Sequence, residues 1–231
     1  MFPLNDDNPS RRIPYITYLL ITSCVVFFFW QLSLGRLGQI AIYSLGMIPA
    51  VLFDFKQLPA GLETIPAWAT LFSAMFLHGG WMHLIGNMLY LWIFGNNVED
   101  AMGHGRFIIF YLLCGLAAAL AQALPNPQSV VPMIGASGAI SGVLGAYILL
   151  YPRARVLVVI PIGLYPFTTR LKAGWVLGFW FLMQIVSSLM ADTQQTGGVA
   201  WGAHIGGFVA GMALIPLFKS KKVRLFAPVR S

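Results

Sequence analysis

The sequence predicts an all-α membrane protein: a bundle of six transmembrane helices with a long membrane-associated first loop. Composition is the first observation behind this fold class. The 231 residues are 58% hydrophobic and 9% charged, whereas a soluble globular protein carries roughly 25% charged residues because its surface faces water. The second observation is that the apolar residues form long runs, without the apolar–polar alternation of a membrane barrel. Most of the exterior is therefore expected to face lipid.

Six apolar stretches approach the length of about 20 residues with which a helix crosses the membrane. They run over residues 13–34, 81–102, 106–124, 137–151, 172–190 and 198–218. The fourth stretch ends at Tyr151 because Pro152 cannot continue a helix. The first is too long for the apolar part of a secretory signal, and no small-residue cleavage site follows it. Residues 13–218 thus form one six-helix domain between an N-terminal tail, 1–12, and a basic C-terminal tail, 219–231.

The connection between the first two stretches, residues 35–80, is far longer than a usual link between helices. It remains rich in aromatic side chains, which are Phe53, Phe55, Trp68, Phe72 and Phe76. Aromatic residues favour the membrane interface, so we expect this loop to enter the interface or to pack on the bundle. A small cap outside the membrane is the alternative.

The basic residues predict the orientation, because Lys and Arg collect on the cytoplasmic side of membrane proteins. An even number of crossings puts both chain ends on one side, and that side holds all but two of the 14 Lys and Arg residues. The other side holds Arg36 and Lys56. Both termini are therefore predicted to be cytoplasmic. The net charge of +7 follows from this distribution and not from one basic patch, so no nucleic-acid partner is expected.

Strongly polar side chains inside a membrane span are costly unless partnered, so they mark candidate functional sites. Asn87 and His204 each lie about 9 Å below the outer end of their spans, and His83 lies one turn above Asn87. The fourth span is short: a helix anchored at the cytoplasmic face begins about 8 Å below the outer surface. Its first residue, Ser137, is expected at the same depth as His204 and Asn87.

Small residues repeat every fourth position in the fourth and sixth spans, which lets helix backbones approach closely in lipid. They are Ser137, Ser141 and Gly145, then Gly138, Gly142 and Ala146, and in the sixth span Ala203, Gly207 and Gly211. Packing these strips together is expected to bring Ser137 towards His204, which can accept the serine proton during attack on a carbonyl. Backbone N–H groups at the start of the fourth helix, with His83 and Asn87, can stabilise the resulting oxyanion.

Other assignments of these residues are weaker. Asp192, before the sixth span, is the acidic residue nearest to His204, but no acid lies within the outer span ends, so we expect a dyad. A metal set of His78, His83 and His204 lacks an acid or cysteine and fits no short metal-binding motif. The two cysteines, Cys24 and Cys114, lie in apolar stretches and are expected to be buried without a disulfide or a metal.

Three motifs give the chain a resemblance to the rhomboid family of intramembrane serine proteases, along essentially its whole length. They are FLHGGWMHLIGNMLYLWIFGNNV at residues 76–98, continued by Glu99 and Asp100, GASG at 135–138, and AHIGG at 203–207. A GxSG motif alone is weak, because unrelated hydrolases contain it. Together with HxxxN in the second span and AHxxG in the last, the set is specific.

The resemblance implies hydrolysis of peptide bonds in or near transmembrane helices of single-span membrane-protein substrates, with small residues before the cut and helix-weakening residues beyond it. It makes Ser137 the nucleophile and His204 the general base, and it puts His83 and Asn87 beside the oxyanion. Glu99 matches a structural acid. The family uses no metal and no organic cofactor.

Two positions depart from the family pattern. Thr70 stands where many members have an arginine in the first loop, and Ser141 stands where some members have an aromatic residue packed under the histidine. Support for His204 is therefore expected from elsewhere, with Trp201 and Tyr147 as candidates.

The resemblance also matches residues 35–80 to the family's membrane-inserted first loop and residues 172–190 to its presumed substrate gate.

Two other classes of protein remain as alternatives. A non-enzymatic relative that binds helices without cutting them typically lacks the serine or the histidine, and both are present. A small transporter predicts ionisable groups at mid-bilayer and duplicated halves, which do not appear. The short tails and the lack of a targeting segment favour a prokaryotic plasma membrane, and nothing indicates the oligomeric state.

Overall fold

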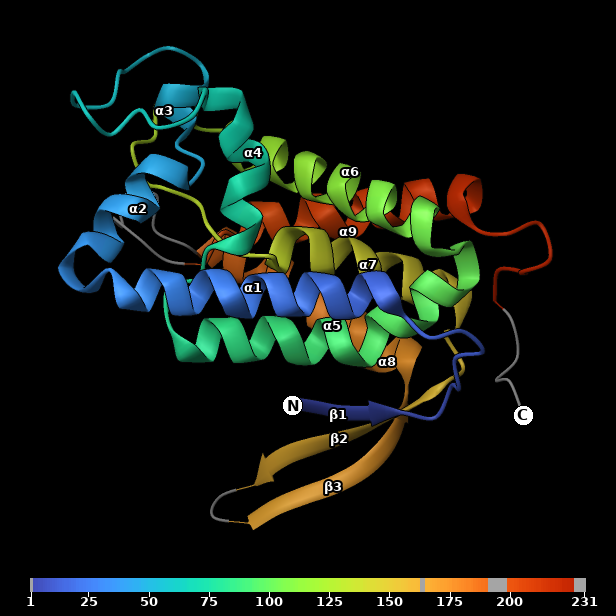
Figure 1. Cartoon of the computed structure of the whole chain (residues 1–231). Helices are drawn as coiled ribbons and strands as arrows, with labels where there is room; N and C mark the ends of the chain where they lie inside the picture. The colour runs from blue at the N-terminus through green and yellow to red at the C-terminus, as the bar shows by residue number, and fades with distance from the viewer. Residues whose placement is uncertain (1, 163–164, 191–198, 227–231) are drawn as a thin grey trace.

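Long helices lying side by side form the body of the molecule (Figure 1). The computed structural model describes residues 2–162, 165–190 and 199–226. The long helices are α1 (Tyr15–Ser33), α5 (Trp81–Met102), α6 (His104–Ala123), α7 (Ser137–Leu150), α8 (Ala173–Met190) and α9 (Trp201–Phe218). A helix therefore occupies each of the six stretches predicted from the sequence.

Four of the described helices, α1, α6, α8 and α9, are long and apolar enough to cross a membrane. Helix α7 has only 14 residues. Helix α5 has 22 residues but carries polar side chains, among them Asn87, Asn97 and Glu99. The count of six crossings thus stays a prediction, whereas a mainly helical membrane fold is confirmed.

Residues 35–80 fold into short helical turns connected by irregular chain. They are η1 (Gly35–Leu37), α2 (Gly38–Leu45), α3 (Pro49–Leu52), η2 (Ala67–Ala69), α4 (Thr70–Ser73) and η3 (Ala74–Phe76). Met47 and Ala74 pack against Ala119 and Ala123 of α6 in a small hydrophobic cluster. The loop therefore packs on the bundle, and its insertion into the membrane stays a prediction.

The prediction of an all-α fold was wrong, because the chain contains a three-stranded antiparallel sheet. Strand β2 (Arg155–Ile162) pairs with β1 (Phe2–Asp6) on one side and with β3 (Tyr165–Lys172) on the other. In β2, buried Val156 and Val158 alternate with less buried neighbours, the pattern of a strand with one face on a core. This alternation is only a few residues long, and a search for membrane-length runs passes over it.

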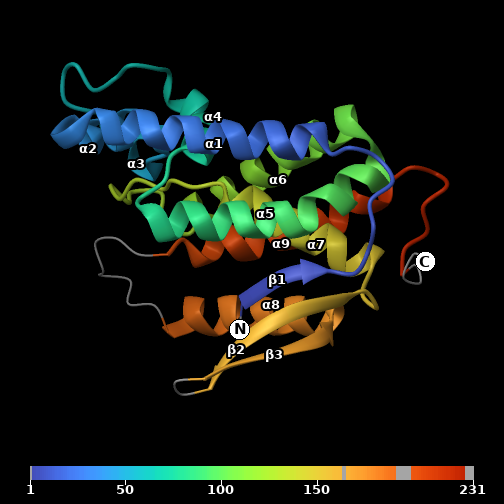
Figure 2. The same cartoon turned by 60° about the horizontal axis from the view of Figure 1, so that its bottom comes forward.

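Strand β1 lies within residues 1–12, the predicted N-terminal tail, and pairs part of that segment with β2. The sheet lies beside α8, with β1 nearest α5 (Figure 2). Asp6 fixes β1 to the bundle: its Oδ2 accepts hydrogen bonds from the Tyr147 hydroxyl of α7 (2.5 Å) and from Asn97 Nδ2 of α5 (2.9 Å). Asn8 Nδ2 donates to Asn97 Oδ1 at 2.9 Å. The start of the chain is thereby bound to two helices.

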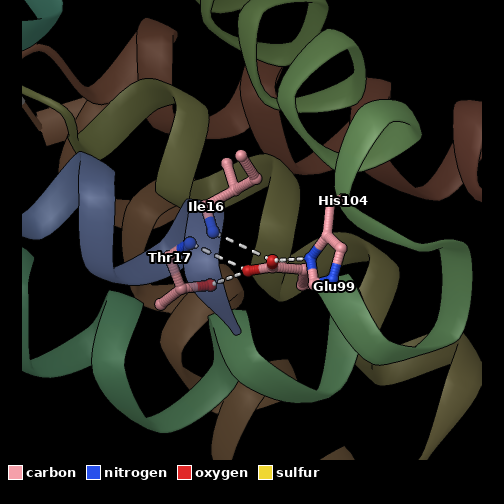
Figure 3. A network of polar contacts seen from close by, with 4 residues as sticks. All are labelled: Ile16, Thr17, Glu99 and His104. Atoms are coloured by element: carbon pink, nitrogen blue, oxygen red, sulfur yellow. Dashed lines mark hydrogen bonds and ion pairs between the residues drawn. The ribbon is translucent and has the colours of Figure 1, made fainter. Parts of the chain in front are cut away.

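Glu99 of α5 binds the start of α1 through hydrogen bonds (Figure 3). Its carboxylate is 1% exposed and accepts hydrogen bonds from the backbone N–H groups of Ile16 (3.0 Å) and Thr17 (2.8 Å) and from the Thr17 hydroxyl (2.7 Å). His104 Nδ1 lies 2.6 Å from the same carboxylate. The first N–H groups of a helix lack partners within the helix, and α1 has no side-chain cap of its own. Glu99 therefore caps α1 from α5, in agreement with a structural role.

The chain enters α1 and leaves α9 at the same end of the bundle. The ring of Tyr15, at the start of α1, lies 5.5 Å from the ring of His104, which begins α6. Beyond α9, the Ser220 N–H donates to the Ala101 carbonyl near the end of α5 at 2.8 Å. This arrangement is the one that an even number of crossings requires.

We predict that the attachment of β1 weakens as the pH rises from about 4 to about 6. Burial, with a smaller effect from the charge of Asp7, raises the pKa of Asp6 from 3.8 to about 6, although the hydrogen bond from Tyr147 opposes the shift. The folded protein therefore holds this proton more tightly than the unfolded chain, and ionisation costs at most about 3 kcal/mol of stability. The midpoint of thermal unfolding in detergent, measured from pH 4 to pH 7, tests this.

Asp6→Asn is the matched control, because an amide keeps an acceptor for Tyr147 but does not titrate. The wild-type midpoint should fall relative to that of Asp6→Asn across this pH range and then level off. Parallel curves for the two proteins would contradict the prediction.

Candidate active site

The candidate site lies where the start of α7 meets the first turns of α9. Ser137 is the first residue of α7, and His204 lies one turn into α9. Ser137 Oγ is 2.8 Å from His204 Nε2, a hydrogen-bond distance. His204 is only 9% exposed, and Ser137 is partly buried. The structure thus brings together the two residues that the sequence selected.

Glycines make this approach possible, because α7 and α9 pack nearly backbone to backbone. A Cβ atom at Gly207 would overlap the carbonyl oxygen of Gly138, and one at Gly211 would overlap the carbonyl oxygen of Gly142. The small-residue strips therefore do pack against each other. The contact sets the register of α9 against α7, and with it the position of His204 opposite Ser137.

Gln184 of α8 holds the other nitrogen of His204, and sequence reasoning missed it. Gln184 Oε1 lies 2.7 Å from His204 Nδ1, and the side chain is 6% exposed. A polar residue inside an apolar stretch is the signal that selected Asn87 and His204, and applied to residues 172–190 it would have indicated Gln184.

Of the two residues expected to support His204, Trp201 lies beside it and Tyr147 does not. The rings of Trp201 and His204 lie edge to face, 6.1 Å apart, and the Trp180 ring lies 6.0 Å away on another side. Tyr147 does not support His204, because its hydroxyl bonds to Asp6 at the far end of α7. Ser141 donates its hydroxyl to the Ser137 carbonyl at 2.7 Å. Asp192 lies outside the described residues.

His83 and Asn87 of α5 face the approach to Ser137. A Cβ atom at Gly135 would lie 2.6 Å from His83 Nε2 and 3.6 Å from Asn87 Nδ2, so both nitrogens lie close to the chain two residues before Ser137. The Gly79 N–H donates to His83 Nδ1 at 3.3 Å. His83 therefore carries its proton on Nε2, the nitrogen on the side of Gly135. Asn87 Nδ2 is buried and has no hydrogen-bond partner within the described chain.

The chemistry open to these groups is nucleophilic attack with an oxyanion on one side. Helix α7 has no side-chain cap, so its first backbone N–H groups are free to donate. With His83 and Asn87 they form three sources of donors around Ser137. A cavity of about 20 Å³ next to Ser137 is lined by small residues, such as Ala74 and Ala203, and by larger ones, such as Leu71 and Met75.

The described residues contain no group of three His, Cys, Asp or Glu side chains able to hold a metal ion. His78 instead places Nδ1 3.2 Å from the Phe76 carbonyl. The metal set of His78, His83 and His204 considered from the sequence is therefore not assembled. Cys24 and Cys114 are both buried and unpaired by any disulfide, as expected.

The chain is similar to a known protein family and to several known proteins. The family model described as Rhomboid domain matches residues 66–221. Rhomboid protein 1, mitochondrial, of Saccharomyces cerevisiae is 27% identical over 180 residues, which are 75% of this chain and 49% of that protein. Rhomboid protease GluP of Bacillus subtilis is 32% identical over 201 residues, 87% of this chain and 35% of that protein. Rhomboid-like protein 11, chloroplastic, of Arabidopsis thaliana is 27% identical over 171 residues, 66% of this chain and 53% of that protein.

The fold and the site define a multi-pass integral membrane protein with a buried serine–histidine pair. The chain belongs to the rhomboid family, since the Rhomboid domain match covers more than half of it. It spans about half or less of the length of these three relatives. Because mitochondrial and chloroplast proteins stand among the relatives, the expectation of a prokaryotic plasma membrane is not borne out.

We predict that Gly135→Ala destabilises the protein at the approach to Ser137. Gly135 has a φ of +116°, which a residue with a Cβ rarely adopts, and the added methyl would collide with His83 Nε2. The unfavourable backbone alone costs about 1–2 kcal/mol. Thermal unfolding in detergent should show a clear fall in the midpoint.

Gly86→Ala on α5 is the matched control, because a Cβ atom there meets open space. In a helix interior this change stabilises by about 0.5–1 kcal/mol. An equal shift of the midpoint in both variants would contradict the local geometry.

Proposed function

We propose that this protein is an intramembrane serine endopeptidase that hydrolyses peptide bonds in or near the transmembrane segments of single-span membrane proteins. The observation that carries the proposal is the 2.8 Å contact between Ser137 Oγ and His204 Nε2 within a rhomboid-family fold. The relatives that bear protease names include Rhomboid protease GluP and Rhomboid-like protease 5 of Toxoplasma gondii.

In the proposed reaction, His204 Nε2 takes the hydroxyl proton while Ser137 Oγ attacks the carbonyl carbon of the scissile peptide bond. The C–N bond then breaks, and His204 gives the proton to the leaving amine. This yields an ester between Ser137 and the substrate's carbonyl side. Water, deprotonated by the same histidine, hydrolyses the ester and restores the serine. The cycle needs no metal and no cofactor.

Charge builds up on the carbonyl oxygen during both attacks, and the proposed oxyanion site is next to Gly135. The proposed donors on that side are the N–H groups of His83 Nε2 and Asn87 Nδ2 and the first backbone N–H groups of α7. Donors already in place cost no reorganisation during the reaction, which is why such sites account for a large part of catalysis. The cavity beside Ser137 has a volume of only about 20 Å³, which favours a small side chain at the cut.

We also propose that both termini are cytoplasmic and that the site opens towards the other side. The arrangement of α1 and α9 supports this, because the chain enters and leaves the bundle at one end, where most of the basic residues lie. A helix-binding relative without protease activity is the second candidate. The contact between Ser137 and His204 favours the enzyme, since a purely binding protein has no need of it.

Purified protein in liposomes should cleave a single-span protein that carries small residues near the outer end of its membrane segment. Ser137→Ala removes the nucleophile and should abolish cleavage without lowering the unfolding midpoint. Ser141→Ala is the control: it removes a hydroxyl one turn further along α7 that donates to the Ser137 carbonyl. It should keep activity within about fivefold, because loss of one such bond costs about 1 kcal/mol. Equal cleavage by wild type and Ser137→Ala would end the assignment.

Asn87→Ala should lower kcat by about 10²–10³-fold with little change in KM, because the loss of one oxyanion donor is felt mainly in the transition state. Steady-state cleavage of the same substrate measures this. Asn96→Ala, at the other end of α5, supplies the comparison and should stay close to wild type. A change confined to KM would show that Asn87 binds substrate and does not stabilise the oxyanion.

A further inference from the structure

Gln184 is an unusual buried residue for its helix. Throughout α8 the buried residues are Ala173, Val176, Leu177 and Gln184, so the half of the helix beyond Leu177 buries a single side chain, and that side chain is polar. An amide in an apolar span is costly unless it is hydrogen-bonded. Its two ends are both bonded: Oε1 to His204 Nδ1 at 2.7 Å, and Nε2 to the Trp180 carbonyl at 3.2 Å.

The Trp180 carbonyl decides which way the amide faces. A carbonyl oxygen only accepts hydrogen bonds, so the NH₂ end of Gln184 must lie beside it. The carbonyl end of the amide is then the one that faces His204 Nδ1. The opposite orientation would put two oxygens together at Trp180 and is unfavourable.

This orientation determines where His204 carries its proton. Gln184 Oε1 only accepts, so Nδ1 of a neutral His204 must be the protonated nitrogen. Nε2 is then left with a free lone pair towards Ser137 Oγ, 2.8 Å away. A general base needs this tautomer, since the other one would present an N–H to the serine and could not take its proton.

We propose that Gln184 is a positioning residue that fixes the tautomer and the ring orientation of His204, as the link between the Trp180 carbonyl and the imidazole in a hydrogen-bonded series of Trp180 carbonyl, Gln184, His204 and Ser137. This inference rests on the proposed function. A carboxylate in the same place would bring a charge into the membrane-spanning part of the bundle, whereas an amide orients the ring without that cost. Because Gln184 lies on α8, this series of hydrogen bonds makes the reactive tautomer of His204 depend on the position of α8.

The test combines kinetics with a direct observation of the tautomer. Gln184→Met keeps the length and the volume of the side chain but removes the carbonyl, and should lower kcat about 10–10²-fold with KM within about threefold. Gln184→Glu keeps an acceptor towards Nδ1, and in its neutral form its O–H replaces the amide N–H at the Trp180 carbonyl. It should restore kcat to within about tenfold of wild type.

Nitrogen-15 NMR of histidine-labelled protein reads the tautomer without any need for activity. The signals of His204 are assigned by their absence from the spectrum of His204→Ala. They should show protonation on Nδ1 in wild type and in Gln184→Glu. In Gln184→Met they should show a mixture of the two tautomers. Gln184→Asn, whose amide is too short to reach Nδ1, should behave like Gln184→Met and replaces it if that variant does not fold. The control is Gln122→Met on α6, where the lost amide accepts from the backbone N–H of Ala203; kcat and tautomer should stay near those of wild type.

An unchanged tautomer and an unchanged kcat in Gln184→Met would overturn the proposal, as would an equal loss of kcat in Gln122→Met. If wild type cleaves no better than Ser137→Ala, the proposed function fails. The NMR result then still decides the role of Gln184, because the tautomer does not depend on turnover.

Discussion

The close packing of α7 against α9 is the constraint on which the rest of the site depends. Glycines 207 and 211 leave no room for a side chain, since a Cβ atom at either would run into a carbonyl oxygen of α7. In lipid the hydrophobic effect does not drive two apolar helices together, so van der Waals packing at this close contact provides the attraction. The same contact prevents α9 from sliding along α7. The serine at the first turn of α7 and the histidine near the start of α9 are then held at hydrogen-bond distance by the helices that carry them.

Around this contact, buried polar groups of one element complete the hydrogen bonds of another. Glu99 of α5 caps the free N–H groups of α1, Asp6 of β1 accepts from α5 and α7, and Gln184 of α8 accepts from His204 of α9. Lipid offers no water to satisfy these groups, so each bond is costly to break. The carboxylates in this set lie towards the end of the bundle where the chain enters and leaves. Next to His204 the structure uses an amide, which orients the imidazole without adding a charge.

The sequence was most informative where membrane physics restricts the choice of residues. Long apolar runs predicted where the helices lie, and small residues four apart predicted which faces of α7 and α9 meet. Polar residues within spans selected Ser137, His204, His83 and Asn87 because few side chains of that kind are tolerated in lipid. The sheet was missed because its strands are short and half exposed, and pairing of Phe2–Asp6 with Arg155–Ile162 joins segments that are far apart in the chain. Gln184 was missed because the partner of His204 was sought among acids and aromatics. Its role depends on which residue of α8 faces inward, and that face is set by tertiary packing.

The central claim is that helix packing turns Ser137 into the reactive nucleophile of a rhomboid-family enzyme. The most direct measurement is the reaction of the intact membrane protein with a fluorophosphonate, followed by mass spectrometry of its peptides. The account predicts a single adduct, on Ser137, that disappears when His204 is replaced by alanine while the fold is retained. An adduct at another serine, or an equal adduct on Ser137 without His204, would contradict it.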